Sequence, residues 1–221
     1  MFADRRDAGR QLAEELLPYQ KEDCLVLALP RGGVVVGYEV AKRLQAPLDV
    51  LVVRKIGAPG QEELAVGAVG PENVVVWNWD LLNYLRFHPE DLENIVQREK
   101  LELKRRQEAF RGQRPFPDLQ GKTVIVVDDG LATGATARAA IQAAKALRPG
   151  KVVLAVPVGS RSTANDFRQD VDDLVCLETP VQFSAVSQWY EKFPQNSDRE
   201  VIELLSSAWR QEAGQSPSRP N

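Results

Sequence analysis

The sequence predicts an α/β protein built on a doubly wound parallel sheet. Two observations predict it: short aliphatic runs alternate with segments of helical periodicity, and each run is apolar at consecutive positions instead of at every second one. Strands of that kind are buried on both faces, as in parallel sheets with helices on each side. With 221 residues and 43% hydrophobic content, the chain has enough material for one domain of ordinary size. We expect that domain to span residues 1–213.

The elements follow in a regular order. A charged amphipathic helix pattern, MFADRRDAGRQLAEELL, opens the chain, and the polar end GQSPSRPN predicts a disordered tail over 214–221. Ligands of open α/β sheets bind at the carboxyl ends of the strands, so a site is expected there. Core strands are predicted at 24–29, 48–53, 123–127, 151–158 and 173–177, and helices at 34–45, 135–147 and 161–169.

Two regions interrupt this order. Residues 57–122 contain a Gly/Pro-rich loop, a short strand VVVWN and a charged helix over 89–112, and such a long excursion is typical of a lid. The charged helix carries seven basic residues between Arg98 and Arg114, but interleaved glutamates indicate a solvent-exposed face. Residues 178–209 hold several aromatic residues and a closing helix, and we interpret them as a small hood over the site.

The totals exclude several classes of function. A net charge of −3 and a pI of about 5.4 argue against a nucleic-acid-binding protein. No run of 18 apolar residues occurs, so no membrane span is expected. Cys24 and Cys176 both lie in apolar runs, which favours a reduced, cytoplasmic protein. His88 is the only histidine and precedes Pro89, which indicates a loop at a helix entry and excludes a multi-His zinc site.

The first strand end carries two glycines, in LPRGG over 29–33. Glycines at a strand-to-helix turn let backbone N–H groups approach an anion, and the guanidinium group of Arg31 adds a full positive charge. Arg31, Gly32 and Gly33 therefore predict a phosphate-type pocket, although an ordinary tight turn explains the glycines equally well. The stretch RGGVVVG does not match the dinucleotide fingerprint, and no P-loop pattern occurs in the chain.

The second strand end carries two cations, Arg54 and Lys55. They are expected at the same sheet edge as the glycines, where they would add to one anion site. Pairing with Glu62 or Glu63 is the alternative interpretation, since surface ion pairs are common.

The third strand end is the stretch VIVVDDGLATGATARAA over 124–140. Asp128 and Asp129 follow four aliphatic residues, and successive side chains of a strand point to opposite sides. The following small residues and threonines can surround a phosphate with N–H groups and hydroxyls at a helix N-terminus. Carboxylates suited to hydroxyls beside amides suited to phosphate predict a sugar-phosphate site, which includes Thr133, Gly134, Ala135 and Thr136.

The motif VIVVDDGLATGAT resembles the phosphoribosyl pyrophosphate motif of type I phosphoribosyltransferases. The stretches ALPRGGVVVGYEVAKRL, VVRKIGAPGQEELAVGAV and FSAVSQWYEKFPQNSDREVIELL extend the resemblance, to a bacterial subfamily of these enzymes, over nearly the whole chain. The resemblance implies transfer of the 5-phosphoribosyl group from phosphoribosyl pyrophosphate to a nitrogenous base, with a purine among the candidates. It also implies Mg²⁺ held through the substrate, with Asp128 and Asp129 nearby, and a homodimer.

The resemblance assigns roles by position. It implies a cis peptide bond at Pro30–Arg31, a flexible catalytic loop from Gly57, and a hood over 178–200. By the same resemblance, Asp128 and Asp129 bind the ribose hydroxyls, and Thr133 to Thr136 hold the 5′-phosphate. Arg31, Gly32 and Gly33 line the pyrophosphate loop, and Arg54 and Lys55 add positive charge nearby.

One position departs from the pattern of 6-oxopurine enzymes. Ala132 stands where those enzymes carry an aspartate, so Glu63 or Glu62 is the candidate proton acceptor, with a structural salt bridge as the alternative. In the hood, Phe183 or Trp189 could stack on a base or simply pack in the core. The acceptor base itself cannot be identified from the residues.

Two other functions compete with the transferase. A regulator that binds phosphoribosyl pyrophosphate or a nucleotide without turnover would use the same fold. A nucleotide or sugar-phosphate hydrolase would need more metal-binding carboxylates than one Asp pair.

Overall fold

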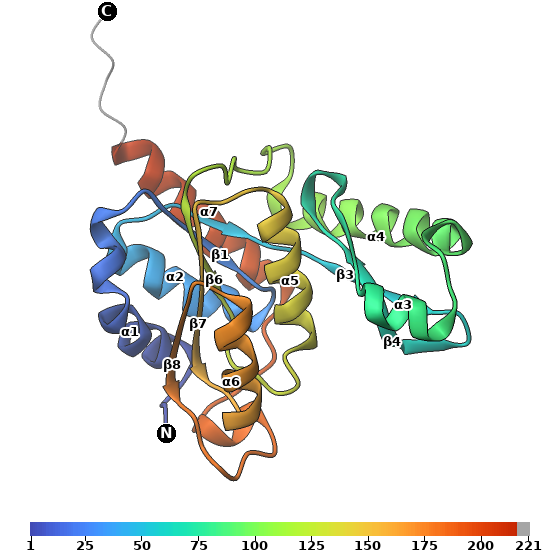
Figure 1. Ribbon diagram of the computed structural model, residues 1–221. Helices are drawn as coiled ribbons and strands as arrows, with labels where there is room; N and C mark the ends of the chain where they lie inside the picture. Colours follow the sequence, from blue (N-terminus) through green and yellow to red (C-terminus); the bar gives the residue numbers. More distant parts are fainter. Residues whose placement is uncertain (216–221) are drawn as a thin grey trace, which may run out of the picture.

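The computed structural model describes residues 1–215 and confirms the predicted parallel sheet (Figure 1). Five parallel strands lie in the order β2-β1-β6-β7-β8. Strand β1 lies inside the sheet, where it pairs with β2 on one side and with β6 on the other. The strand bounds are β1 Cys24–Ala28, β2 Leu48–Val50, β6 Thr123–Val127, β7 Lys151–Val158 and β8 Asp173–Glu178.

Helices cover both faces of this sheet, as the consecutive apolar positions require. On one face, Val26 and Ile125 pack in a cluster with residues of α1, α2 and α7, and on the other, Leu25 and Val126 pack with residues of α5 and α6. The cysteines behave as predicted: Cys24 is buried in the first cluster and Cys176 packs against the second. The helices are α1 Arg5–Glu15, α2 Gly32–Leu44, α5 Ala135–Ala146, α6 Arg161–Asp170 and α7 Asp198–Gln215, with the 3-10 helix η1 at Leu17–Lys21.

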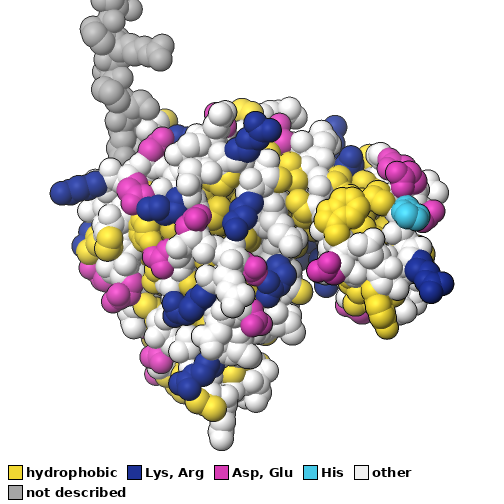
Figure 2. Space-filling view, viewed as in Figure 1, with side chains coloured by type: hydrophobic (Ala, Val, Ile, Leu, Met, Phe, Trp, Pro, Cys, Tyr) yellow, Lys and Arg dark blue, Asp and Glu magenta, His cyan; other side chains and the backbone are white. Residues whose placement is uncertain are grey.

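Residues 54–112 form a second unit, which we call the side lobe (Figure 1). Its three strands make an antiparallel sheet in the order β3-β4-β5, and hydrophobic side chains gather over α3 on its surface (Figure 2). His88 precedes η3, and its N–H donates to Asp91 Oδ2 at 2.8 Å, as expected of a helix-entry residue. The elements are β3 Arg54–Ala58, β4 Gln61–Val69, η2 Pro71–Asn73, β5 Val75–Trp77, α3 Trp79–Leu85, η3 Pro89–Leu92 and α4 Glu93–Arg111.

The side lobe corrects two expectations. The segment from Gly57 to Gly70, expected as a loop, is largely a β-hairpin whose tight turn lies at Gly60, where φ is +74°. The hairpin forms because Val66, Ala68 and Val69 on β4 are buried, where β4 packs against α4 of the lobe and α5 of the main sheet. Strand β2 ends at Val50 instead of continuing to residue 53, and Arg54 and Lys55, expected at the end of that strand, begin the separate strand β3.

Two ion pairs attach α4 to its surroundings. Arg111 donates to both oxygens of Asp49 on β2, at 2.7 and 2.9 Å, and both side chains are at most 5% exposed. Burial raises the pKa of Asp49, and Arg111 opposes that rise. On β3, Arg54 contacts Glu99 at 2.7 Å. The direction of α4 is therefore fixed at its middle and at its C-terminal end.

The hood region contains little regular structure apart from η4, Val186–Trp189. The N-terminal segment is tied to it, because Phe2 N–H donates to the Trp189 carbonyl and Glu191 N–H donates to the Phe2 carbonyl, both at 2.8 Å. Helix α7 packs against α2, α4 and β2 and so covers a sheet face, while its first residue, Asp198, pairs with Arg31 of the loop after β1 at 2.8 Å. The first two residues of the expected tail, 214 and 215, end α7, and its remainder lies outside the described residues.

Candidate functional site

The ends of β1 and β6 meet at one edge of the sheet. Leu29 N–H donates to the Val127 carbonyl at 2.8 Å, which sets Pro30 beside the start of the acidic pair. The peptide bond Pro30–Arg31 is cis, as expected. A Cβ atom at Gly33 would stand 2.8 Å from the Val127 oxygen, so a side chain there would collide with β6.

Gly32 has an even closer neighbour. A Cβ atom built on it would overlap Asp129 Oδ2 and lie 2.7 Å from Arg5 Nε. No side chain fits in that space. Two of the three predicted pyrophosphate-loop residues, Gly32 and Gly33, are therefore in direct contact with the acidic motif.

Asp129 is held by a cluster that the sequence did not indicate. Arg5 Nε donates to Asp129 Oδ2 at 2.7 Å, Arg5 Nη1 donates to the Pro194 carbonyl at 2.7 Å, and its guanidinium carbon lies 3.6 Å from the centroid of the Phe193 ring. Tyr190 Oη donates to the Asp129 backbone carbonyl at 2.6 Å. The side chains of Arg5 and Asp129 are 9% and 17% exposed, so this is a largely desolvated pair.

Asp128 lies on the other side of the strand end. Its Oδ1 accepts from Asp129 N–H at 2.8 Å. Burial first, and then the neighbouring charge of Asp129, raise its pKa well above the usual value, while Arg5 opposes the rise. The two carboxyl groups thus have different surroundings although they are adjacent in the chain.

The predicted phosphate loop forms the entry into α5. Gly134 has φ +71°, and a Cβ atom there would lie 2.5 Å from the ring of Phe167. Thr163 Oγ1 donates to the Ala132 carbonyl at 2.9 Å, which ties the loop to α6. Thr133 and Thr136 are exposed, and neither side chain makes a hydrogen bond within residues 1–215. The loop leaves its hydroxyls and the first N–H groups of α5, from Ala135 onward, available to an anion.

A cavity of about 650 Å³ lies between this loop and the hood. Phe183, which the sequence predicts to contact a base, is among its lining residues, and no acidic residue is. Trp189 is not among its lining residues and packs against the cluster of Phe2 and Tyr190 instead. The lining residues are Ala132, Thr133, Ser160, Arg161, Ser162, Asn165, Val181, Phe183 and Ser184.

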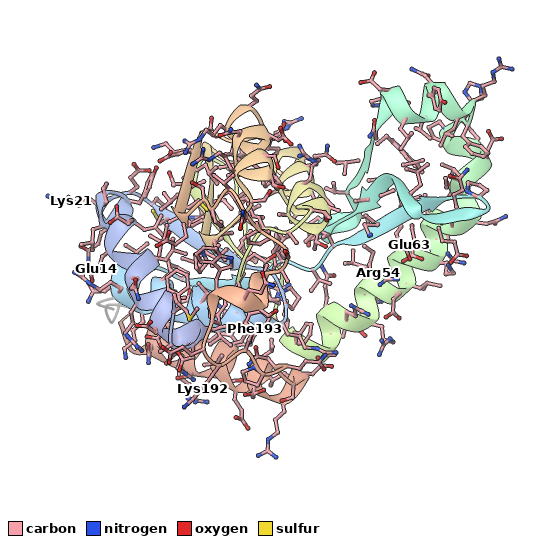
Figure 3. All side chains as sticks on the ribbon, turned by 90° about the horizontal axis from the view of Figure 1, so that it is seen from below. Glu14, Lys21, Arg54, Glu63, Lys192 and Phe193 are labelled. Carbon is pink, nitrogen blue, oxygen red and sulfur yellow. The ribbon has the colours of Figure 1, made fainter. Side chains whose placement is uncertain are left out.

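Arg54, Lys55 and Glu63, which the sequence predicts near the strand ends, do not lie at this edge of the parallel sheet. Arg54 belongs to the side-lobe sheet and pairs with Glu99, not with Glu62 or Glu63. Lys55 and Glu63 are exposed. Figure 3 shows Arg54 and Glu63 in the side lobe, apart from Phe193, which stacks on Arg5 beside Asp129.

A second cavity, of about 480 Å³, lies beside the loop after β1 that contains Arg31 and Gly32. Arg105 and Arg106 of α4 line it together with Arg31 and Arg5. The sequence interpretation gave this helix a solvent-exposed face, which holds for most of it, but it missed that these two arginines reach the strand ends. No local pattern distinguishes them from the other basic residues of α4, because the contact depends on how the side lobe packs.

Within residues 1–215, no three His, Cys, Asp or Glu side chains come together as a metal-binding group. No helix in the same range is long and apolar enough to cross a membrane. Asp128 and Asp129 offer oxygen donors, and Mg²⁺ is commonly held by one or two carboxylates together with substrate phosphates. The donor set therefore fits a Mg²⁺ ion that arrives with a phosphorylated ligand.

Comparisons with known proteins show the family to which the chain belongs. Two Mycobacterium tuberculosis proteins, from strains CDC 1551 and H37Rv and provisionally named phosphoribosyl transferases, are each 49% identical over 210 residues, 95% of this chain. The chain spans 47% of the length of these relatives. The crystal structure of TT1426 from Thermus thermophilus matches with a TM-score of 0.85 and 41% identity, covering 94% of this chain and 98% of that one. The model of the phosphoribosyl transferase domain matches residues 3–191, and the chain belongs to that family.

Proposed function

We propose that the protein transfers the 5-phosphoribosyl group from phosphoribosyl pyrophosphate to a nitrogenous base and releases pyrophosphate. The observation that carries the proposal is the convergence of an acidic pair and two glycine-containing anion loops at one sheet edge, between two cavities. Family membership supports the class of reaction.

Each part of phosphoribosyl pyrophosphate has a matching group of residues at the carboxyl-end edge of the parallel sheet. In the proposal, the loop from Thr133 to Thr136, exposed at both threonines, receives the 5′-phosphate, and Asp128 and Asp129 receive the ribose hydroxyls. The backbone over 31–33 receives the pyrophosphate. Phe183 lines the cavity assigned to the base, where an aromatic face offers stacking.

The chemistry asks the protein chiefly for placement of charge. As pyrophosphate leaves C1 of the ribose, positive charge develops on the ring and negative charge on the leaving group. Bound Mg²⁺ would supply neutralisation of the phosphate oxygens. In the proposal, the carboxylates hold the ribose and the loop amides hold the two phosphate ends.

Binding without turnover is the second candidate function. Two observations favour it: no acidic residue lines the base cavity, so no proton acceptor is at hand there, and Glu63 lies on the side lobe. A regulator would bind phosphoribosyl pyrophosphate without releasing pyrophosphate.

A turnover assay separates the two functions. The protein is incubated with phosphoribosyl pyrophosphate, Mg²⁺ and a panel of bases, and pyrophosphate release is followed while products are identified by mass spectrometry. The proposal predicts a nucleoside monophosphate with at least one base and loss of turnover in Asp129→Asn. Micromolar donor binding with no release from any base would favour the regulator.

Assembly and location complete the proposal. We propose a cytoplasmic homodimer, with the side lobe as the contact between subunits. Trp79 and Tyr84 on α3 support this, because their side chains are large and apolar and the residues are 58% and 80% exposed. Light scattering at micromolar concentration checks it, and a monomer mass would contradict it.

A further inference from the structure

The cavity beside the loop after β1 is rich in arginine. Arg5, Arg31, Arg105 and Arg106 face it, with Asp198 as the one acidic residue among the lining residues. Arg105 and Arg106 come from α4 of the side lobe, whereas Arg31 belongs to the loop after β1. The cavity therefore joins the side lobe to the sheet edge.

The two α4 arginines share a single carboxylate. Arg105 donates to both oxygens of Glu102 at 2.8 Å, and Arg106 donates to one of them at 3.0 Å. These two guanidinium groups lower the pKa of Glu102 to about 2, so it is ionised at neutral pH. Two positive charges against one negative charge leave an excess of one beside the cavity. The Arg105 and Arg106 side chains are 68% and 49% exposed and are accessible to a ligand.

The position of these arginines is set by buried contacts further along the helix. Arg111, about one and a half helical turns beyond Arg105 and Arg106, forms an ion pair with Asp49 of β2. The neighbouring Phe110 is buried in the cluster that contains Val26 and Ile125. The pairing of Glu99 with Arg54 fixes the preceding turns. A helix held in this way presents cations at a constant place, which favours a binding role over a loosely solvated surface.

We propose that Arg105 and Arg106 bind the pyrophosphate group of the ligand, opposite the backbone of 31–33. The inference rests on the proposed function and adds the side lobe to it. A guanidinium group offers a planar fork of donors that matches phosphate oxygens, and two adjacent forks suit a group with two phosphates. The alternative is a purely structural role, in which both residues only stabilise α4 by pairing with Glu102 at the i,i+3 and i,i+4 spacings.

Inorganic pyrophosphate with Mg²⁺ is the probe, titrated calorimetrically into four variants and the wild type. Changing both Arg105→Gln and Arg106→Gln should weaken binding at least tenfold. Lys104→Gln is the matched control, because Lys104 is on the same helix, 73% exposed, paired with Glu108, and not a lining residue. Glu102→Gln should tighten binding several-fold, since it frees both guanidinium groups. Glu108→Gln should leave binding unchanged.

The outcomes separate this inference from the proposed function. Wild-type affinity in the double variant, with donor binding still sensitive to Asp129→Asn, would overturn the role of α4 and leave the transferase standing. Failure of the wild type to bind pyrophosphate at all would overturn both the α4 role and the pyrophosphate half of the site. Tighter binding by Glu102→Gln supports the inference independently, because a folding defect does not increase affinity.

Discussion

At the scale of single residues, the site depends on a glycine and an arginine that approach the same carboxylate. Asp129 can take its position because Gly32 has no side chain, and its charge is balanced because Arg5 reaches it from the N-terminal helix. The acids and glycines were predictable, since each follows a strand in a local pattern. Arg5 was not, because 124 residues separate it from Asp129 and nothing local marks the pair.

Arg5→Gln should destabilise the ligand-free protein by about 3 kcal/mol, because it leaves a largely buried carboxylate without its partner. Arg6→Gln is the control: its side chain is 48% exposed and pairs with Glu39, so the expected loss is below about 1 kcal/mol. Urea denaturation followed by circular dichroism gives both values. An equal decrease in the free energy of unfolding in the two variants would mean that the Arg5–Asp129 pair stabilises the protein no more than an exposed ion pair does.

At the scale of elements, the strands and helices of the main sheet were predictable to within a few residues, because each has a continuous apolar run or a helical period. The hairpin of β3 and β4 was not, because its Gly and Pro residues suggested an open loop. Tertiary packing determines the structure of that segment, because the hairpin packs against α4 of the side lobe and α5 of the main sheet, and a local sequence pattern does not encode such contacts.

The attachment of α4 is the element-scale contact that we expect to matter most for stability. Arg111→Ala would leave Asp49 buried and unpaired on β2, at a cost of about 3–5 kcal/mol. Arg114→Ala removes a pair with Glu212 in which both side chains are 39% exposed, and should cost less than about 1 kcal/mol. Thermal and urea unfolding measure both, and an Arg111→Ala protein as stable as Arg114→Ala would show that α4 is held in another way.

At the scale of the whole molecule, the parallel sheet carries the acids and loops, while the hood and side lobe stand on either side of the edge (Figure 1). The parallel sheet was predictable because chain order and apolar runs define it. Which residues of the hood and side lobe reach the edge was not, because that depends on how separate units pack. Phe183 lines the cavity beside Ala132 and Thr133, and its predicted role there stays a prediction, whereas Arg105 and Arg106 were missed.

The most direct test of the account is calorimetric titration of phosphoribosyl pyrophosphate with Mg²⁺ into the wild type, Asp129→Asn and Asp166→Asn. Asp166 is an exposed residue of α6, so its variant controls for loss of one negative charge. The account predicts micromolar binding by the wild type and Asp166→Asn, and binding weaker by about tenfold or more in Asp129→Asn, as loss of a hydrogen bond to a charged group implies. Equal affinity in all three, or no binding by the folded wild type, would contradict the assignment of this edge to the sugar phosphate.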